Sequence, residues 1–99
     1  MAKYYLTKKA IEDLSNIWDY TFEEWSELQA DRYYQMLIEN FKEISQNPDL
    51  GKNYEDISTT LSGLKAGKHI IFYRRIASDE VEITRILHEM MELKRKIKE

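Results

Sequence analysis

The hydrophobic period of this chain changes once, after about residue 60, from about 3.6 residues to 2. Before that point the apolar side chains recur at three- and four-residue steps, the spacing of one face of a helix. After it they alternate, as they do along half-buried strands. A chain with this order of patterns is predicted to pack helices on a sheet, which is an α+β fold.

Two helices are predicted in the first half, over about residues 8–24 and 27–46. Thr7 suits the N-cap of the first helix, because its hydroxyl can accept a hydrogen bond from a backbone N–H of residue 9 or 10. "SELQ" (26–29) matches a capping box at the start of the second helix. Pro48 ends that helix, because proline lacks an N–H. The two helices should form an antiparallel hairpin whose apolar faces need a partner.

That partner is predicted to be a sheet formed mainly by residues 61–88, as three strands with turns near Ala66–Gly67 and at "ASDE". "KYYLT" (3–7) can add an edge or neighbouring strand, and "EMMELKRKIKE" (89–99) a short helix. The alternation places Ile70, Phe72 and Ile76 on one face of the middle strand, and Val81, Ile83 and Leu87 on one face of the last. Met90, Leu93 and Ile97 would share one face of the terminal helix.

The predicted order is therefore β-α-α-β-β-β with a short C-terminal helix. A helical hairpin packs on one face of a small antiparallel sheet, and residues 1–99 form a single domain. Apolar residues on both faces of the strands indicate that the other face is covered as well.

Composition excludes several classes of site. The chain has no cysteine, so it has no disulfide framework, thiolate zinc site or cysteine nucleophile. No apolar run approaches the roughly 18 residues that span a bilayer, and no signal peptide precedes the first helix, so we expect a cytoplasmic protein with no membrane contact. The net charge is −3, with 6 Lys/Arg against 12 Asp/Glu in residues 1–60 and 9 against 6 in residues 61–99. Only the C-terminal third suits an approach to a phosphate backbone.

Several segments together resemble a known family. They are "NP" after the second helix, "LSGLKAGKHIIFYR" (61–74), "EITRILH" (82–88) and, in support, "EEWSELQADRYYQ" (23–35). The chain resembles, over essentially its whole length, the ParE-type toxins of bacterial toxin–antitoxin modules in the RelE/ParE superfamily. The resemblance implies a small toxin that acts on DNA gyrase and is silenced by a ParD-like antitoxin, without a cofactor. RelE-type members share the fold and instead cut messenger RNA on the ribosome, so the fold does not choose between them.

The alternative of a ribosome-dependent messenger RNA endonuclease would place Tyr73, Arg85 and His88 in catalysis, with Lys65 as an added cation. Structural roles compete with each assignment. Tyr73 lies among apolar strand residues and is typical of a core aromatic. The guanidinium of Arg85 would pair with a nearby carboxylate, and a ring nitrogen of His88 would cap a backbone carbonyl at the strand end. His69 has no metal-type partner nearby, and Glu12–Asp13 is typical of a solvated helix face.

We favour a toxin that acts by contact, with no catalytic residue and no metal. Its target-binding region should run from the last strand to Lys98, and an indirect contact with gyrase-bound DNA would use the basic residues there. The residues expected to bind the target are Arg85, His88, Met90, Met91, Leu93, Lys94 and Arg95. The exposed parts of Trp18, Trp25, Tyr33 and Tyr34 are expected to bind an antitoxin segment. A third reading is a degenerate toxin that only binds its antitoxin.

Overall fold

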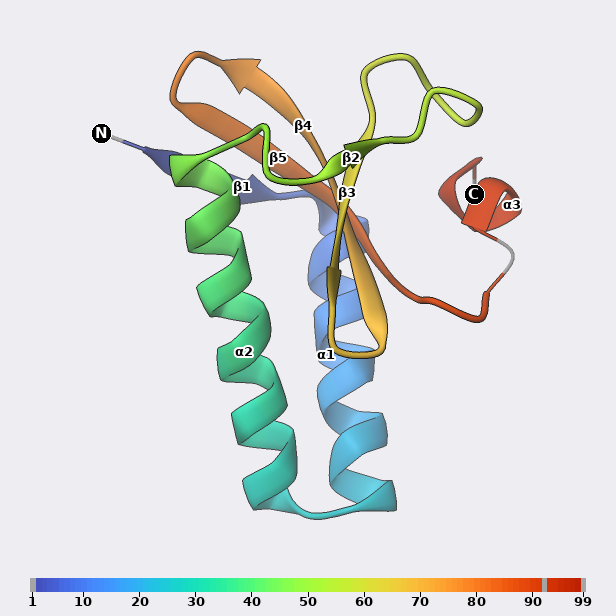
Figure 1. The fold of residues 1–99 in the computed structure, drawn as a ribbon. Helices are drawn as coiled ribbons and strands as arrows, with labels where there is room; N and C mark the ends of the chain where they lie inside the picture. Colours follow the sequence, from blue (N-terminus) through green and yellow to red (C-terminus); the bar gives the residue numbers. More distant parts are fainter. Residues whose placement is uncertain (1, 92, 99) are drawn as a thin grey trace.

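The computed structural model describes residues 2–91 and 93–98, in which two long helices pack on one face of a five-stranded sheet (Figure 1). The elements in chain order are β1 (Lys3–Leu6), α1 (Lys8–Glu24), α2 (Glu27–Gln46), β2 (Lys52–Asn53), β3 (Ser62–Ala66), β4 (His69–Ala77), β5 (Glu80–His88) and α3 (Leu93–Lys98). The predicted α+β fold is confirmed, and both long helices have the predicted bounds.

The caps that define the helical hairpin are the predicted ones. The Thr7 hydroxyl accepts a hydrogen bond from the backbone N–H of Ala10 at 3.1 Å, and the Ser26 hydroxyl accepts one from Gln29 at 3.1 Å. α2 ends at Gln46, so that Asn47 already has a non-helical backbone, as the residue before a proline favours. These local signals mark the bounds of the helices at these positions.

The sheet is mixed, whereas the sequence predicted an antiparallel one. Its order is β1-β5-β4-β3-β2, and β1 pairs parallel with β5, with Lys3 opposite Glu80 and Leu6 opposite Ile83. The other three pairings are antiparallel. β1 is joined to the rest of the sheet through the whole helical hairpin and not through a tight turn, so its connection does not require an antiparallel pairing.

The predicted faces of β5 are wrong, because the strand has a β-bulge at Thr84. Phe72 pairs with Arg85 and Tyr73 pairs with Ile83, so Thr84 is an extra residue with no opposite partner. The extra residue shifts the alternation by one position. Val81 and Ile83 therefore lie with Ile86 in the core under the helices, while Leu87 lies in the core on the other face.

The second face of the sheet is also covered, as predicted. Its core is formed by Leu61, Ile70, Phe72 and Leu87, against which Tyr54, Ile57, Leu93 and Ile97 pack. Ile76, predicted on this face, is half exposed near the far end of β4 beside a second irregularity in the pairing. Met90 precedes α3 instead of sharing its apolar face, because the helix begins only at Leu93.

The far ends of α1 and α2 extend beyond the strands, together with the connection between them (Figure 1). In this part Phe22, Trp25 and Leu28 are exposed. Within the described part of the chain, none of the helices combines the length and the apolar character that crossing a bilayer requires.

Candidate functional site: a cleft at the end of the β4–β5 hairpin

A cleft of about 370 Å³ lies between α1 and the end of β5, where several of the predicted site residues meet. α1 contributes Asp13 and Ile17 to its walls, and Met91 lies on the segment after β5. The remaining lining includes Asn16, Tyr20, His69, Arg85, Ile86, Leu87, His88 and Lys96. The cleft is thus mostly apolar, with two histidines and an ion pair placed at fixed positions.

Arg85 is held by an ion pair with Asp13. Its Nε and Nη2 donate to the two carboxylate oxygens at 2.7 and 3.0 Å, and Nη1 donates to the carbonyl of Lys96 at 2.8 Å. Asp13 also accepts the backbone N–H of Ile86 at 3.0 Å. The prediction that Arg85 pairs with a carboxylate is confirmed. The guanidinium joins α1, β5 and α3, and three of its five N–H donors make these bonds inside the protein.

His69 and Tyr33 form a short hydrogen bond at the wall of the cleft. The Tyr33 hydroxyl lies 2.6 Å from Nδ1 of His69 and accepts the backbone N–H of Lys68 at 2.9 Å. Burial, together with the neighbouring His88, lowers the pKa of His69 to about 4. Burial also raises the pKa of Tyr33. At neutral pH the pair is therefore an uncharged imidazole and an uncharged phenol.

His88 ends β5 and stands edge-on to His69, with ring centroids 5.3 Å apart. Its Nδ1 accepts the backbone N–H of Met90 at 3.1 Å. The sequence predicted a bond to a carbonyl; the ring accepts an N–H instead because the chain turns directly after the strand. Lys65, the proposed added cation, is mostly exposed and pairs with Glu89 at 3.0 Å.

Tyr73 lies away from this cleft. It is buried, donates to the carbonyl of Pro48 at 2.7 Å and accepts the backbone N–H of Gly51 at 2.8 Å. Burial raises the pKa of its hydroxyl, so it is protonated at neutral pH. Of the three residues that a ribonuclease would need, Arg85 and His88 share the cleft, and Tyr73 anchors the loop after α2.

Arg85 and His88 lie on β5, and the other residues expected to bind a target follow that strand and differ in the exposure of their side chains. Met90 is 84% exposed and Met91 44%. Leu93, in contrast, packs against the second core, because it forms the first turn of α3. Arg95 is exposed, and the side chain of Lys94 lies outside the described residues. Met90 and Met91 are therefore the exposed apolar side chains on this segment at the edge of the cleft.

The residues expected to bind an antitoxin lie on the helical hairpin. Trp18 stacks on Phe22 at 5.2 Å and donates from Nε1 to Asp31 at 3.1 Å, which ties α1 to α2. Trp25 is 72% exposed and Tyr34 is exposed as well. Tyr33 is separate from them, because its hydroxyl faces His69. We refer to the group formed by Trp18, Phe22, Trp25 and Leu28 as the hairpin patch.

Sequence reasoning missed two members of the cleft. Asp13 was read as part of a solvated face, but its side chain is 13% exposed and pairs with Arg85. Its place one residue before the buried Leu14 was a signal for a half-buried position. The Tyr33–His69 bond links residues 36 positions apart, and no local pattern indicates it. Among residues 2–91 and 93–98, no three His, Asp or Glu side chains gather in a way that suits a metal ion.

The family model and the similar proteins each match nearly the whole chain. Residues 4–93 match the family described as ParE toxin of type II toxin–antitoxin system, parDE. The chain is 30% identical over 96 residues to Toxin ParE1 of Mycobacterium tuberculosis, covering 97% of this chain and 98% of that protein. It is 33% identical over 91 residues to Toxin ParE1 of Caulobacter vibrioides, covering 92% and 93%.

A solved structure has the same fold. It is described as a chromosomal ParDE TA system from P. aeruginosa, and it superimposes with a TM-score of 0.75 over 89% of this chain and 96% of that one. The two sequences are 22% identical, so the likeness concerns the fold.

Proposed function

This chain belongs to the ParE toxin family of type II toxin–antitoxin systems, and from that premise we propose that it inhibits DNA gyrase by protein–protein contact. A ParD-like antitoxin neutralises it in the cytoplasm. The family assignment supports the toxin role, and the mode of action is argued from the cleft. No cofactor, metal or membrane takes part.

The observation that carries the proposal is how the candidate catalytic side chains are engaged. Proton transfer and charge stabilisation need groups that are free to face a substrate. Three donors of Arg85 are directed to Asp13 and Lys96, and both roles of the Tyr73 hydroxyl are used by Pro48 and Gly51. These contacts support a structural role for both residues.

The target-binding surface we propose is centred on Met90 and Met91, beside the cleft. Methionine side chains are flexible and polarisable, which suits a contact with an irregular protein surface. Arg85 and His88 position this segment, Arg85 through Lys96 and His88 through the N–H of Met90. Leu93, Lys94 and Arg95 extend the surface along α3, where the basic residues would approach DNA held by gyrase.

The antitoxin-binding surface we propose is the hairpin patch with Tyr34. Exposed aromatic and aliphatic side chains on adjacent helices form the kind of surface on which an amphipathic segment folds as it binds. The half-buried Tyr33 would contribute its ring edge and not its hydroxyl, since the hydroxyl is bonded to His69. The connection between α1 and α2, which carries the exposed Trp25, lies beyond the strands, so a segment can reach it without opening the core (Figure 1).

The experiment is a plasmid gel with purified protein, gyrase and ATP, in which cleaved DNA should accumulate. Met90→Ser should reduce cleavage, because it removes an exposed anchor, while Ile76→Ser serves as the control. Ile76 is 50% exposed at the far end of β4, so both changes remove an exposed apolar side chain. Equal loss in the two variants, or no cleavage by the unchanged protein, would contradict the proposal.

One observation favours a second candidate, a ribosome-dependent ribonuclease: Arg85 and His88 line the same cleft. His88→Ala tests it better than Arg85→Ala, because the arginine also holds the ion pair. A ribonuclease requires that wild-type protein cut messenger RNA in a translating extract and that His88→Ala stop the cutting.

A further inference from the structure

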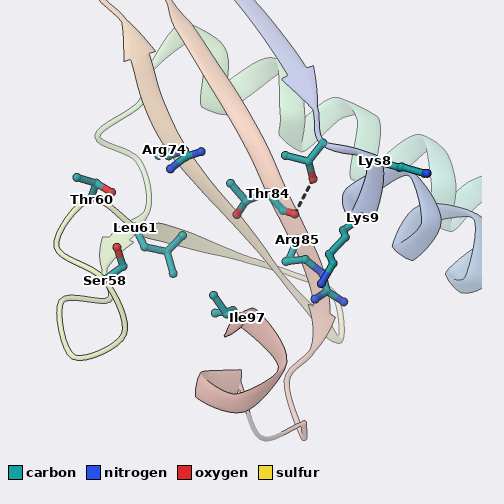
Figure 2. A pocket seen from close by; sticks show the side chains of 10 residues that line it. Lys8, Lys9, Ser58, Thr60, Leu61, Arg74, Thr84, Arg85 and Ile97 are labelled. Carbon is teal, nitrogen blue, oxygen red and sulfur yellow. Dashed lines mark hydrogen bonds between the residues drawn. The ribbon is translucent and has the colours of Figure 1, made fainter. Parts of the chain in front are cut away.

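A second cavity, of about 390 Å³, lies beside the second core, and among the described residues only Arg85 lines both this cavity and the cleft (Figure 2). Its lining comes from the start of α1, from β4 and β5, from the loop at 58–61 and from α3. Figure 2 shows Lys9 directed towards Arg85, while Lys8 points away from the other lining side chains. Five separate segments thus line one open hollow.

The charged side chains that line this cavity are all basic: Lys8, Lys9, Arg74 and Arg85. Arg85 is paired with Asp13, and Arg74 is paired with Glu82 at 2.8 Å. Neither carboxylate lines the cavity. Lys8 and Lys9 make no ion pair with any described residue, so they supply the excess positive charge. This local excess contrasts with the net charge of −3 for the whole chain.

Hydroxyl groups also line the cavity, from the residue before α1, from β5 and from the loop at 58–61. Thr7 donates its hydrogen to the carbonyl of Thr84 at 2.8 Å, the dashed line in Figure 2, and Thr84 donates to the carbonyl of Phe72 at 3.2 Å. Ser58 and Thr60 make no side-chain hydrogen bond within the described part of the chain, so both can donate to a ligand.

The cavity also has an apolar side, formed by Leu61 and Ile97. A ligand that fits all three features carries a negative charge beside an apolar surface. A nucleotide unit of a nucleic-acid strand has this character, because its phosphate is always charged and its sugar and base offer apolar faces. A carboxylate on a peptide matches the charge, but its short side chain leaves the apolar side unfilled.

We propose that this cavity binds a phosphodiester group of a nucleic-acid strand, with Lys9 as its cation, Lys8 adding positive charge at its edge, and Ser58 and Thr60 as its hydroxyl donors. The proposal deepens the proposed function and rests on it for the identity of the strand, which would be DNA held by gyrase. Phosphate binding itself needs no gyrase, so the two can fail separately.

The test measures the fluorescence anisotropy of a labelled single-stranded DNA oligonucleotide as the purified full-length chain is added. Replacing both Lys8 and Lys9 with alanine should weaken binding about tenfold at low salt and lower the salt slope by about 1 for each lysine. The control replaces Lys3 and Lys42, which are exposed and lie outside the cavity, and it changes the net charge equally. An RNA oligonucleotide of the same sequence distinguishes the two kinds of strand.

A second readout locates the site. Inorganic phosphate should shift the backbone amide resonances of Ser58 and Thr60 in the unchanged chain and not in the Lys8/Lys9 variant. If the Lys8/Lys9 variant and the Lys3/Lys42 control bind the oligonucleotide equally weakly, the proposal is overturned, because net charge alone would then explain the loss of binding. Absence of oligonucleotide binding would overturn it as well, as would a loss of antitoxin binding in the Lys8/Lys9 variant with oligonucleotide binding unchanged.

Discussion

Arg85 and Asp13, 72 positions apart in the chain, form a two-pronged ion pair that fastens α1 to β5 at the edge of the cleft. The side chains are 14% and 13% exposed, so each charge depends on the other for compensation. The pair also sets the position of α3 through the carbonyl of Lys96. A residue that looks catalytic in the sequence is therefore a structural junction between three elements.

Arg85→Met should destabilise the protein by about 3–5 kcal/mol, because it leaves a mostly buried carboxylate unpaired. In an Asp13→Asn background the same change should cost about 1–3 kcal/mol less, since asparagine has no charge to leave behind but can still accept the N–H of Ile86. Urea unfolding of the four proteins gives the coupling energy. A coupling energy near zero would mean that the pair contributes nothing to stability.

Tyr73→Phe should lower the free energy of unfolding by about 1–3 kcal/mol, because Pro48 and Gly51 each lose a buried partner. Growth inhibition by the variant should persist at a temperature where it is folded. Tyr5→Phe is the control, since that side chain is 46% exposed. A folded Tyr73→Phe protein that no longer inhibits growth would restore a chemical role for this hydroxyl.

His69 should make the protein less stable in mild acid. Its pKa is about 4 in the folded chain and about 6.5 when unfolded, so the unfolded state binds more protons between these values. The contribution is complete above about pH 6.5 and is lost as the pH falls towards 4. After allowance for solvent screening, it amounts to about 1 kcal/mol between about pH 7.5 and pH 5.

His69→Asn isolates this contribution, because asparagine does not titrate and its oxygen can replace Nδ1 as the acceptor for Tyr33. Urea unfolding at the two pH values should show a smaller loss of stability in the variant than in the wild type. The same loss in both proteins would mean that His69 does not titrate differently on folding.

Trp25→Ser should weaken antitoxin binding by about tenfold or more, because large aromatic side chains dominate such interfaces. The melting temperature should hardly change, since the indole is 72% exposed. Leu50→Ser, which removes an exposed apolar side chain outside the hairpin, is the control. Calorimetric titration with the antitoxin checks both variants. Unchanged affinity in Trp25→Ser would move the antitoxin surface away from the hairpin patch.

The sequence predicted the elements well, because their signals are local. Thr7, Ser26 and Pro48 each act on neighbouring backbone groups, and they define both long helices. The faces of β5 were predicted wrongly because the bulge at Thr84 has no signal within the strand itself. The hydroxyl of Thr7 helps to hold the bulge by bonding the carbonyl of Thr84, 77 positions away.

The cleft was predicted only in part for the same reason. Arg85 and His88 were identified from the segment in which they lie, but Asp13 and His69 acquire their roles through contacts with residues distant in sequence. The apolar neighbours of Tyr73 indicated a core aromatic, but its two hydrogen bonds, to Pro48 and Gly51, join segments distant in sequence and had no local signal. Residue type and strand position alone do not distinguish these uses.

The most direct test of a toxin that acts by contact is one protein preparation assayed in parallel on two targets. One reaction contains gyrase, plasmid DNA and ATP, and the other contains a translating extract with labelled messenger RNA. We predict cleaved plasmid in the first and intact messenger RNA in the second. Intact supercoiled plasmid together with cut messenger RNA would contradict the account.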